Sequence, residues 1–303
     1  LGANEAPPAI ISIFLGEQLF DVIEQLEKGP ASSSKSGGEL KLGVTSLPTL
    51  PRDATDRNRT SPFAFTGNKF EFRAVGSEQS CAGPNVVLNT IVSEALDEIC
   101  TQLDADAAAG KDFNDSLQAI LTEAIKKHKR ILFNGDNYTD EWVVEAEKRG
   151  LPNLKKTPEA LKAMLTDASI GVFGKYDVLS ETEVKSRYEV YSEAYEEQVA
   201  IEARCALTIA KTSIAPAALE YQMDLAATIK AVEAAGVSDV DGTRDLLKFV
   251  CAETSKLLAG IKALDAAEAA AKPLATLAAM ESLRAAADTL EGVVPDTLWP
   301  LPS

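Results

Sequence analysis

Histidine is almost missing from this chain, which has one in 303 residues. That residue, His128, lies in a basic run typical of a solvated helix end, so chemistry based on histidine is not expected. Long apolar runs are missing as well. The early run at 9–15 is far shorter than the ~20 residues that a membrane span needs, and no basic region precedes it as in a signal peptide. We therefore expect a cytoplasmic protein without membrane contact.

Cysteine pairs at metal-binding or redox spacing are also absent. The four cysteines lie far apart, which favours reduced, buried thiols over a disulfide framework or a zinc site; they are Cys81, Cys100, Cys205 and Cys251. Positive charge is scarce, with 30 Lys and Arg against 46 Asp and Glu and a formal net charge of -16. A polyanion would be repelled, so nucleic acid is not an expected partner. A few arginines can still form a local site for a small anionic substrate.

The order of residue types along the chain indicates an α+β protein. Residues 1–82 are rich in Gly, Pro and Phe, whereas the chain after Asn85 is dominated by alanine-rich periodic segments. Helical spacing of apolar residues predicts helices at 9–27, 85–103, 114–133 and 142–149, and further helices that begin at Thr157, Ser180, Thr243 and Pro273. Pro216 should kink or interrupt the helix that Ser180 begins. The apolar stripes of the last third are typical of a bundle core and not of a cofactor site.

The pentapeptide that begins at Lys69 reads Lys-Phe-Glu-Phe-Arg, in a stretch that alternates as a strand. Successive side chains of a strand point to opposite faces, so Phe70 and Phe72 should anchor one face in a core. Lys69, Glu71 and Arg73 would line the other. If that face lines a cavity, Glu71 can hold a divalent cation and Arg73 can hold anionic oxygens. The same alternation marks any half-buried strand with a solvated face, and the pentapeptide alone leaves both interpretations open.

Two further segments carry candidate residues. Residues 56–59 read Asp-Arg-Asn-Arg in a turn-forming, proline-bounded stretch. Arginine is suited to multi-donor recognition of carboxylate or phosphate, which makes Arg59 a candidate, although solvated arginines of a surface turn explain the same composition. Glu5 lies in a stiff loop that reads Asn-Glu-Ala-Pro-Pro. Taken alone, it would be an ordinary surface carboxylate.

Together these segments resemble the glutamine synthetases. The motifs are Glu-Ala-Pro at 5–7, Asn-Arg-Thr at 58–60, Lys-Phe-Glu-Phe-Arg at 69–73 and Ala-Gly-Pro-Asn at 82–85. The type III branch is indicated by the run 58–77, Gly-Asp-Asn-Tyr at 135–138, Arg-Gly-Leu-Pro-Asn at 149–153 and Leu-Trp-Pro-Leu-Pro at 298–302. The resemblance covers essentially the whole chain, and residues 14–50 and 225–290 are its least distinctive parts.

The resemblance implies an ATP-dependent ligase. It would transfer the γ-phosphoryl group of ATP to the side-chain carboxylate of L-glutamate, and ammonia would then displace phosphate to give glutamine. Glu71 matches a ligand of Mg²⁺ or Mn²⁺, and Arg73 matches an arginine that contacts the glutamyl carboxylate and the phosphoryl group. Arg59 matches the arginine that stabilises charge on that phosphoryl group and contacts the nucleotide. Glu5 matches a flap glutamate that closes the site and helps to deprotonate ammonium.

Three departures qualify this match. Lys69 stands where the family usually has arginine, so we expect it to contact ATP as a point charge. Ala64 stands where many members have a second arginine, so phosphate must be held by fewer or different cations. A family-specific insertion, at about 14–50, separates Glu5 from Arg59.

The chain begins without methionine, and the family's other metal-binding residues would precede Leu1. We expect a C-terminal portion, truncated at its N-terminus and by a few residues at its C-terminus, that is inactive alone.

The expected organisation has three parts. Residues 1–84 would end a catalytic domain with a few antiparallel strands, 85–178 would add the helices that complete it, and 179–303 would form a helical bundle and tail. The resemblance implies self-association into a large ring-based oligomer, a dodecamer, with active sites between neighbouring subunits. Two alternatives are a non-catalytic relative with a regulatory or scaffold role in nitrogen metabolism, and a purely helical interaction protein. The latter does not account for the first 80 residues.

Overall fold

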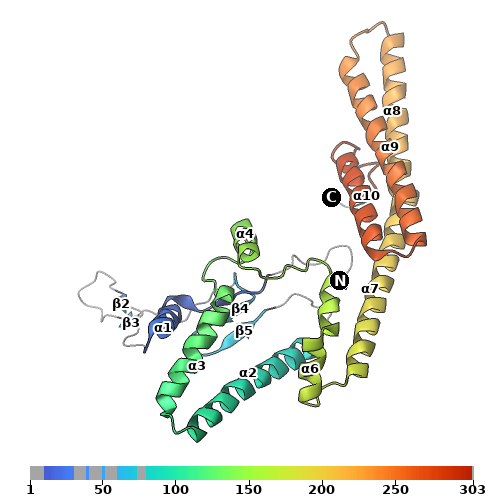
Figure 1. Cartoon of the computed structure of the whole chain (residues 1–303). Helices are drawn as coiled ribbons and strands as arrows, with labels where there is room; N and C mark the ends of the chain where they lie inside the picture. The colour runs from blue at the N-terminus through green and yellow to red at the C-terminus, as the bar shows by residue number, and fades with distance from the viewer. Residues whose placement is uncertain (1–9, 31–38, 41–49, 52–59, 74–79, 302–303) are drawn as a thin grey trace. The chain divides into compact units, whose positions relative to one another are not determined.

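The computed structural model describes residues 10–30, 39–40, 50–51, 60–73 and 80–301. The described chain divides into two compact units, of which the first ends at Val184 and the second begins at Lys185. The first unit combines a small sheet with helices, and the second is helical (Figure 1). The α+β class predicted from the sequence is confirmed. The expected division at residues 84 and 178 stays a prediction.

The sheet of the first unit has three short strands in the order β1-β4-β5. Strand β1 (Ile13–Phe14) pairs in parallel with β4 (Phe63–Phe65), and β4 pairs antiparallel with β5 (Phe70–Phe72). A separate antiparallel pair is formed by β2 (Glu39–Leu40) and β3 (Leu50–Pro51). The strand expected around the pentapeptide of Lys69 is confirmed over Phe70–Phe72, and the antiparallel expectation holds for every described pair of strands except β1 with β4.

The helix expected at 9–27 is wrong in its first part. Ile13 and Phe14 form β1 instead, because their backbone pairs with Phe63 and Ala64 and the carbonyl of Ile13 accepts a hydrogen bond from Phe133 N. Gly16 has a φ of 75°, in the left-handed region that glycine adopts without steric cost. The chain turns there, and helix α1 follows over Gly16–Lys28.

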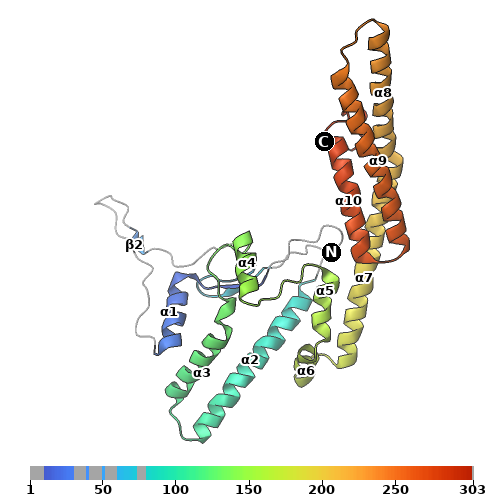
Figure 2. The ribbon, with the colours of Figure 1, turned by 45° about the horizontal axis from the view of Figure 1, so that its top comes forward.

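Helices form the remainder of the first unit. They are α2 (Ala82–Ala108), α3 (Phe113–His128), the 3₁₀ turn η1 (Lys129–Ile131), α4 (Asp140–Lys148), α5 (Thr157–Leu161), the 3₁₀ turn η2 (Lys162–Leu165) and α6 (Asp167–Lys175). Helix α1 packs against α3, and α2 packs against α3 and α6 (Figure 2). The N-cap of α5 is Lys156, so Thr157 lies inside the helix and Pro158 occupies its second position. The helix start predicted at Thr157 is confirmed.

The second unit contains the long helices. Helix α7 (Glu181–Ile209) leads through the π-helical turn η3 (Ala210–Ile214) into α8 (Ala215–Ala234), and α9 (Asp241–Ala269) and α10 (Pro273–Glu291) follow. Pro216 lies in the first turn of α8, so the interruption predicted there is confirmed. Helix α9 packs against both α8 and α10. The predicted stripe of α9 is buried, and it consists of Val250, Leu257, Ile261 and Leu264.

Side-chain hydrogen bonds fix the chain at two helix ends. Ser180 forms a capping box with Glu183, whose carboxylate accepts from the backbone and hydroxyl of Ser180 at 2.8 Å each. After α10, Trp299 is buried and its indole N–H donates to Glu291 at 2.9 Å. The segment after α10 is therefore fixed to that helix.

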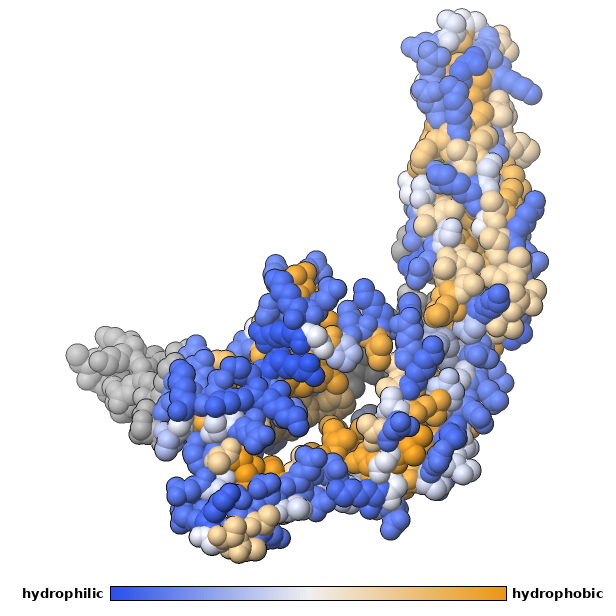
Figure 3. Space-filling view, viewed as in Figure 1, coloured by the Kyte–Doolittle hydropathy of each residue, from blue (hydrophilic) through white to orange (hydrophobic). Residues whose placement is uncertain are grey.

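Some apolar and sulfur-bearing side chains are more exposed than the sequence suggested. Cys81, Cys100 and Cys205 are exposed free thiols, and Cys251 is half-buried, so the expectation of buried thiols is wrong. Figure 3 shows apolar surface over α2 and α6. Exposed apolar residues of α2 include Val86, Val87, Ile91, Val92 and Leu96. Among the described residues, no helix is long and apolar enough to cross a membrane.

Candidate functional site

Strand β5 carries the charged residues of the candidate site. Glu71 forms ion pairs in both directions along the strand: Arg73 Nη2 lies 2.8 Å from its Oε2, and Lys69 Nζ lies 3.3 Å from its Oε1. All three side chains lie on one face because they alternate with the two phenylalanines of the strand. The predicted cluster of Lys69, Glu71 and Arg73 is therefore present, and both carboxylate oxygens of Glu71 face a cation.

Arg73 is the best-fixed cation of the cluster. Its Nη1 donates to the carbonyl of Ser61 at 3.2 Å, and its backbone N–H donates to the carbonyl of Pro62 at 2.7 Å. Lys69, by contrast, has a side chain that is 65% exposed. Arg73 is thus positioned by the fold, whereas Lys69 is positioned mainly by Glu71.

The two cations keep Glu71 ionised. The hydrogen bond from Arg73 is the largest cause that holds the pKa of Glu71 below its ordinary value of 4.5, and the hydrogen bond from Lys69 is the second. Burial raises this pKa and opposes both, but the net shift is downward. An ionised carboxylate is the form that binds a cation or balances an arginine, so Glu71 is available for either role near neutral pH.

The opposite face of the sheet is aromatic and differs from the expectation. Phe70 is 50% exposed and Phe72 is 37% exposed, so neither anchors the strand in a core. They pack instead against Phe63 and Phe65 of β4, with ring centroids 5.2 to 6.0 Å apart. The register explains this, because Phe63 lies opposite Phe72 and Phe65 lies opposite Phe70. The buried residue of β4 is Ala64, which lies opposite Glu71.

A turn far along the chain supports the sheet from the β1 side. Asn134 Oδ1 accepts from the backbone N–H of Leu15 at 3.0 Å and of Gly16 at 3.2 Å. Asn137 Oδ1 accepts from the hydroxyl of Ser12 at 2.6 Å, and the backbone N–H of Asn137 donates to the carbonyl of Thr60 at 2.9 Å. The turn thereby joins the segment before β1 to the segment before β4.

Sequence reasoning missed this supporting role. The sequence predicts a helix that ends at 133, and it offers 135–138 only as a mark of resemblance. The available signal was the Asn-Gly-Asp-Asn run itself, because asparagine side chains readily bind backbone groups in turns. Which strand they would bind was not readable from local sequence. Glu5 and Arg59 lie outside the described residues, so their assigned roles stay predictions.

The described residues do not form a metal centre by themselves. No group of three or more His, Cys, Asp or Glu side chains in the described part could hold a metal ion. Glu71 offers hard oxygen ligands of the kind that Mg²⁺ and Mn²⁺ prefer, and its low pKa suits that role. However, both oxygens are already engaged by cations. One such carboxylate does not make a site without ligands from elsewhere.

Comparisons with known proteins agree on one family. A family model described as the glutamine synthetase C-terminal domain matches residues 116–233. The chain is 36% identical over 323 aligned residues to the type-3 glutamine synthetase of Dictyostelium discoideum, which covers 100% of this chain and 43% of that protein. It is 36% identical to the glutamine synthetase of Bacteroides fragilis (strain YCH46) and 35% identical to that of Butyrivibrio fibrisolvens, with 100% of this chain and 44% and 45% of those proteins covered.

The chain thus spans less than half the length of the curated relatives that it matches. The matches cover the whole chain, including the residues of β5. The family model lies over α3 to α8, so it overlaps both compact units. The chain therefore belongs to the glutamine synthetase family, to the type III branch that its motifs predicted.

Proposed function

We propose that this chain is part of a glutamine synthetase that joins ammonia to L-glutamate at the expense of ATP, through a γ-glutamyl phosphate, in nitrogen assimilation. The observation that carries the proposal is the cluster on β5. Glu71 is ionised and lies between Lys69 and Arg73 on the non-aromatic face of the sheet. The family match supports the assignment of these three residues to the active site.

Arg73 is proposed to bind substrate anions. Its guanidinium can present several donors to carboxylate or phosphoryl oxygens in a fixed geometry, and the carbonyl of Ser61 already orients it. Glu71 then balances the arginine when no substrate is bound. A substrate anion would compete with Glu71 for Arg73. When the anion binds Arg73, one carboxylate oxygen of Glu71 becomes free for another partner.

Glu71 is also proposed to be one ligand of the Mg²⁺ or Mn²⁺ ion that accompanies ATP, together with ligands that the described residues do not provide. Such an ion would neutralise charge on phosphate oxygens. Lys69 is proposed to contact the nucleotide as a point charge, consistent with its exposed side chain. Glu5 and Arg59 keep the roles that the resemblance implies, as flap glutamate and phosphoryl-binding arginine.

The proposal also concerns how a complete active site is assembled, since the described residues do not provide all of its metal ligands. We propose that the 303-residue chain alone is inactive and that the active sites form between subunits of a ring-based oligomer, a dodecamer. A test is to assay the purified chain for ATP-dependent formation of glutamine from L-glutamate and ammonia. No activity above a no-enzyme control is expected, and glutamine formation at a rate proportional to chain concentration would refute this part.

The catalytic assignment is tested in an enzyme of the relatives' length that contains this chain. Glu71→Ala is expected to remove nearly all biosynthetic activity, because one removed ligand disturbs metal and phosphate placement together; we expect a loss of at least about 100-fold. Glu189→Ala, an exposed carboxylate on α7, is the matched control. Near-wild-type turnover of Glu71→Ala with unchanged metal dependence would contradict the assignment.

A non-catalytic regulatory or scaffold relative is the second candidate. The long helices of the second unit, α7 to α10, could provide the surface for that role. The formed ion pair between Glu71 and Arg73 favours catalysis, since a site without chemistry has no need to keep it. Binding of ATP with millimolar or weaker affinity and no turnover in the longer protein would favour the scaffold.

A further inference from the structure

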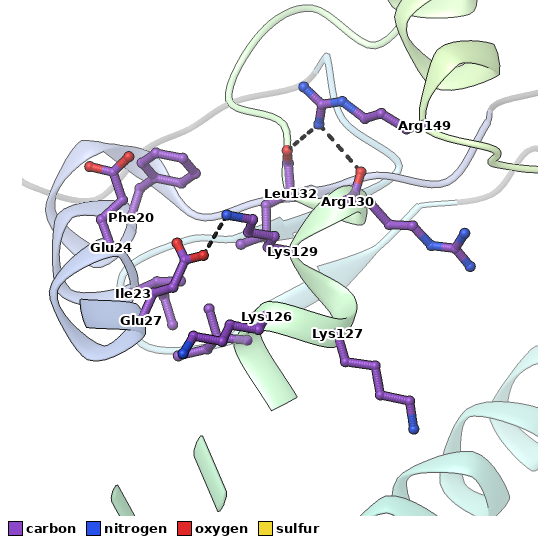
Figure 4. Close-up of a pocket in the computed structure, with 11 residues that line it drawn as sticks. Phe20, Ile23, Glu24, Glu27, Lys126, Lys127, Lys129, Arg130, Leu132 and Arg149 are labelled. Atoms are coloured by element: carbon purple, nitrogen blue, oxygen red, sulfur yellow. Dashed lines mark hydrogen bonds and ion pairs between the residues drawn. The ribbon is translucent and has the colours of Figure 1, made fainter. Parts of the chain in front are cut away.

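A pocket of about 480 Å³ lies in the first unit, away from the residues of β5. It is bounded by α1, by the C-terminal end of α3 with η1, and by Arg149 after α4 (Figure 4). Its volume falls in the range of small-molecule sites, roughly 300 to 1,000 Å³. The pocket is therefore large enough for a compact organic ligand.

One part of the lining is apolar. Phe20 and Ile23 come from α1, Ile125 comes from α3, and Leu132 follows η1. Phe20 and Ile23 are half-buried, so their side chains remain partly accessible. These residues can cover the apolar body of a ligand.

The rest of the lining is mainly basic, although the chain as a whole is acidic. Two of its cations are already engaged. Lys129 Nζ lies 2.5 Å from Glu27 Oε1. Arg149 pairs with Glu145 at 2.6 Å and donates to the carbonyls of Arg130 and Leu132 at 3.3 and 2.9 Å.

Three cations are not engaged in this way. Lys126, Lys127 and Arg130 form no ion pair with any residue that the structure describes. In Figure 4, Lys126 and Lys129 point toward α1, whereas Lys127 and Arg130 point away from it. Lys126 is therefore the cation that faces the apolar residues of α1 without an acidic partner.

Neutralisation of the α3 dipole does not explain so many cations. A helix C-terminus carries about half a negative charge, but α3 has three basic residues in its last turn and η1 adds Lys129 and Arg130. Helices α1, α4 and α6 each have one basic residue in the last turn, and α2, α8, α9 and α10 have none. The end of α3 therefore carries more positive charge than these other helix ends, and its concentration at this pocket favours an anionic ligand.

We propose that this pocket binds a small organic phosphate, with the phosphate between Lys126 and Lys129 and an apolar or aromatic body over Phe20 and Ile23. Lysines act as point charges that suit a phosphate dianion. Arg149, whose fork would select a planar carboxylate, is held by Glu145 and two backbone carbonyls, whereas Lys129 has Glu27 as its partner, which a phosphate can replace. The proposal goes beyond the proposed function, because no residue of the pocket belongs to the β5 site.

Phenyl phosphate is the probe for isothermal titration calorimetry on the 303-residue chain. It joins a phosphate to one aromatic ring and is no reactant of the proposed ligase, so failure here would leave the proposed function untouched. Binding with a dissociation constant on the order of 1 mM is expected. Phenol, which lacks the charge, and inorganic phosphate, which lacks the ring, should each bind at least several-fold more weakly. No heat of binding up to about 10 mM phenyl phosphate would overturn the proposal.

Two adjacent lysines provide a matched pair of variants. Lys126→Gln should weaken phenyl phosphate roughly tenfold, because one charge-assisted contact is lost. Lys127→Gln removes the same charge from a side chain that points away from α1 and should change the affinity less than about twofold. Equal weakening by both would show nonspecific attraction and would overturn the site. Phe20→Ala should weaken phenyl phosphate but not inorganic phosphate.

Glu27→Gln is expected to increase binding, and a misfolded chain could not produce that result. It releases Lys129 from its ion pair and removes a repelling carboxylate, so phenyl phosphate should bind several-fold more tightly. Unchanged or weaker binding by a folded Glu27→Gln chain would contradict the proposed phosphate position.

Vesicles with phosphatidylserine distinguish a lipid headgroup from a free phosphate. Sedimentation of the chain with such vesicles that 10 mM phenyl phosphate (about ten dissociation constants) does not reverse would overturn a small-molecule site.

Discussion

The carboxylate of Glu71 is held by the guanidinium of Arg73, two residues along the same strand, with Oε2 and Nη2 2.8 Å apart. Lys69 approaches the other carboxylate oxygen from two residues before. Alternation in a strand is enough to build this cluster, because residues two apart share a face. Arg73 is therefore paired before any substrate binds, and a bound anion must exchange with Glu71 instead of meeting a free arginine.

The first prediction concerns the pKa of Glu71. Arg73→Gln should raise this pKa toward its ordinary value of 4.5, because Arg73 is the largest cause of its lowering. Lys69→Gln should raise it less. The pair contributes stability above the unfolded-state pKa, and that contribution is lost as the pH falls through the lower folded value. An NMR titration of the Glu71 carboxyl group measures this pKa in both variants. A larger shift in Lys69→Gln than in Arg73→Gln would contradict the conclusion that Arg73 has the larger effect.

The second prediction concerns Lys69 and rests on the proposed function. In the longer enzyme, Lys69→Ala should raise the KM for ATP several-fold and leave kcat within about twofold, because an exposed point charge contributes mainly to ground-state binding. Steady-state kinetics with ATP, glutamate and ammonia varied in turn separate the constants. An effect confined to the KM for ammonia would show that Lys69 has been assigned the wrong ligand.

The third prediction concerns the contact between Ser12 and Asn137, both of which are buried. Asn137→Ala would leave the Ser12 hydroxyl without its acceptor at 2.6 Å, which should lower the free energy of unfolding of the first unit by about 1–3 kcal/mol. Chemical denaturation followed by the fluorescence of Trp142, which is fully buried in this unit, measures the loss.

A double-mutant cycle provides the control for this contact. Ser12→Ala in the Asn137→Ala background should cost less than Ser12→Ala alone, because the acceptor is already gone. The coupling energy should be about 1 kcal/mol. Strictly additive losses would show that the two side chains do not stabilise the turn through each other.

The fourth prediction concerns an ion cluster between α2 and α6. Lys175 Nζ lies 2.7 Å from Glu94 and 2.8 Å from Asp97, and the Tyr176 hydroxyl donates to Glu94 at 2.7 Å. Hydrogen bonds from Lys175 are the largest cause that lowers the pKa of both carboxyl groups, and Asp97 is the largest that raises the pKa of Lys175. Burial first, then Glu94, raises the pKa of Tyr176 to about 12.

The directions of these pKa shifts define the pH range in which the cluster stabilises the fold. The carboxylates contribute stability above their unfolded pKa values, and they lose it as the pH falls through the lowered folded values. Lys175 and Tyr176 contribute below their unfolded values and lose that contribution as the pH rises through the raised ones. Lys175→Met should therefore lower the Tm near pH 7 but have little effect near pH 2 (about two units below the carboxyl values). Lys155→Met, on an exposed loop, is the control, and an equal Tm loss at both pH values would contradict the linkage.

Sequence reasoning predicted those features that depend on local pattern. The charged face of β5 follows from alternation, and the buried stripe of α9 follows from a helical period. The helix start at Ser180 also depends on local sequence, because its capping partner in the structure, Glu183, is only three residues away. In each case the residues that decide the structure lie within one or two turns of each other, or within a single strand.

The features that were missed depend on partners distant in sequence. Ile13 has helical apolar spacing, yet it forms a strand because Phe63 pairs with it. Phe70 was expected in a core, but its partners are the phenylalanines of β4, so it remains half exposed. The role of Asn137 depends on Ser12, 125 residues earlier. Such long-range pairings cannot be predicted from local sequence.

The last prediction concerns the close approach of α9 to α10 at Gly260. A Cβ added there would lie 3.2 Å from Leu283 Cα and 3.3 Å from Leu283 Cδ1. Alanine favours a helix over glycine by about 0.5–1 kcal/mol, but backbone atoms of α10 cannot yield as a side-chain tip can, and overpacking costs typically 1–3 kcal/mol. Gly260→Ala should therefore destabilise the helical unit by about 1 kcal/mol.

Gly242, on the same helix, is the matched control because nothing lies within 4 Å of a Cβ added there. Gly242→Ala should leave the free energy of unfolding unchanged or raise it by up to about 0.5 kcal/mol, since only helix propensity changes. Thermal and chemical denaturation of both variants, followed by the fluorescence of Trp299, compare the two positions directly. If Gly260→Ala were as stable as Gly242→Ala, α9 and α10 would not be held as closely as the 3.2 Å approach requires, and Leu283 would have room to move away from the new methyl group.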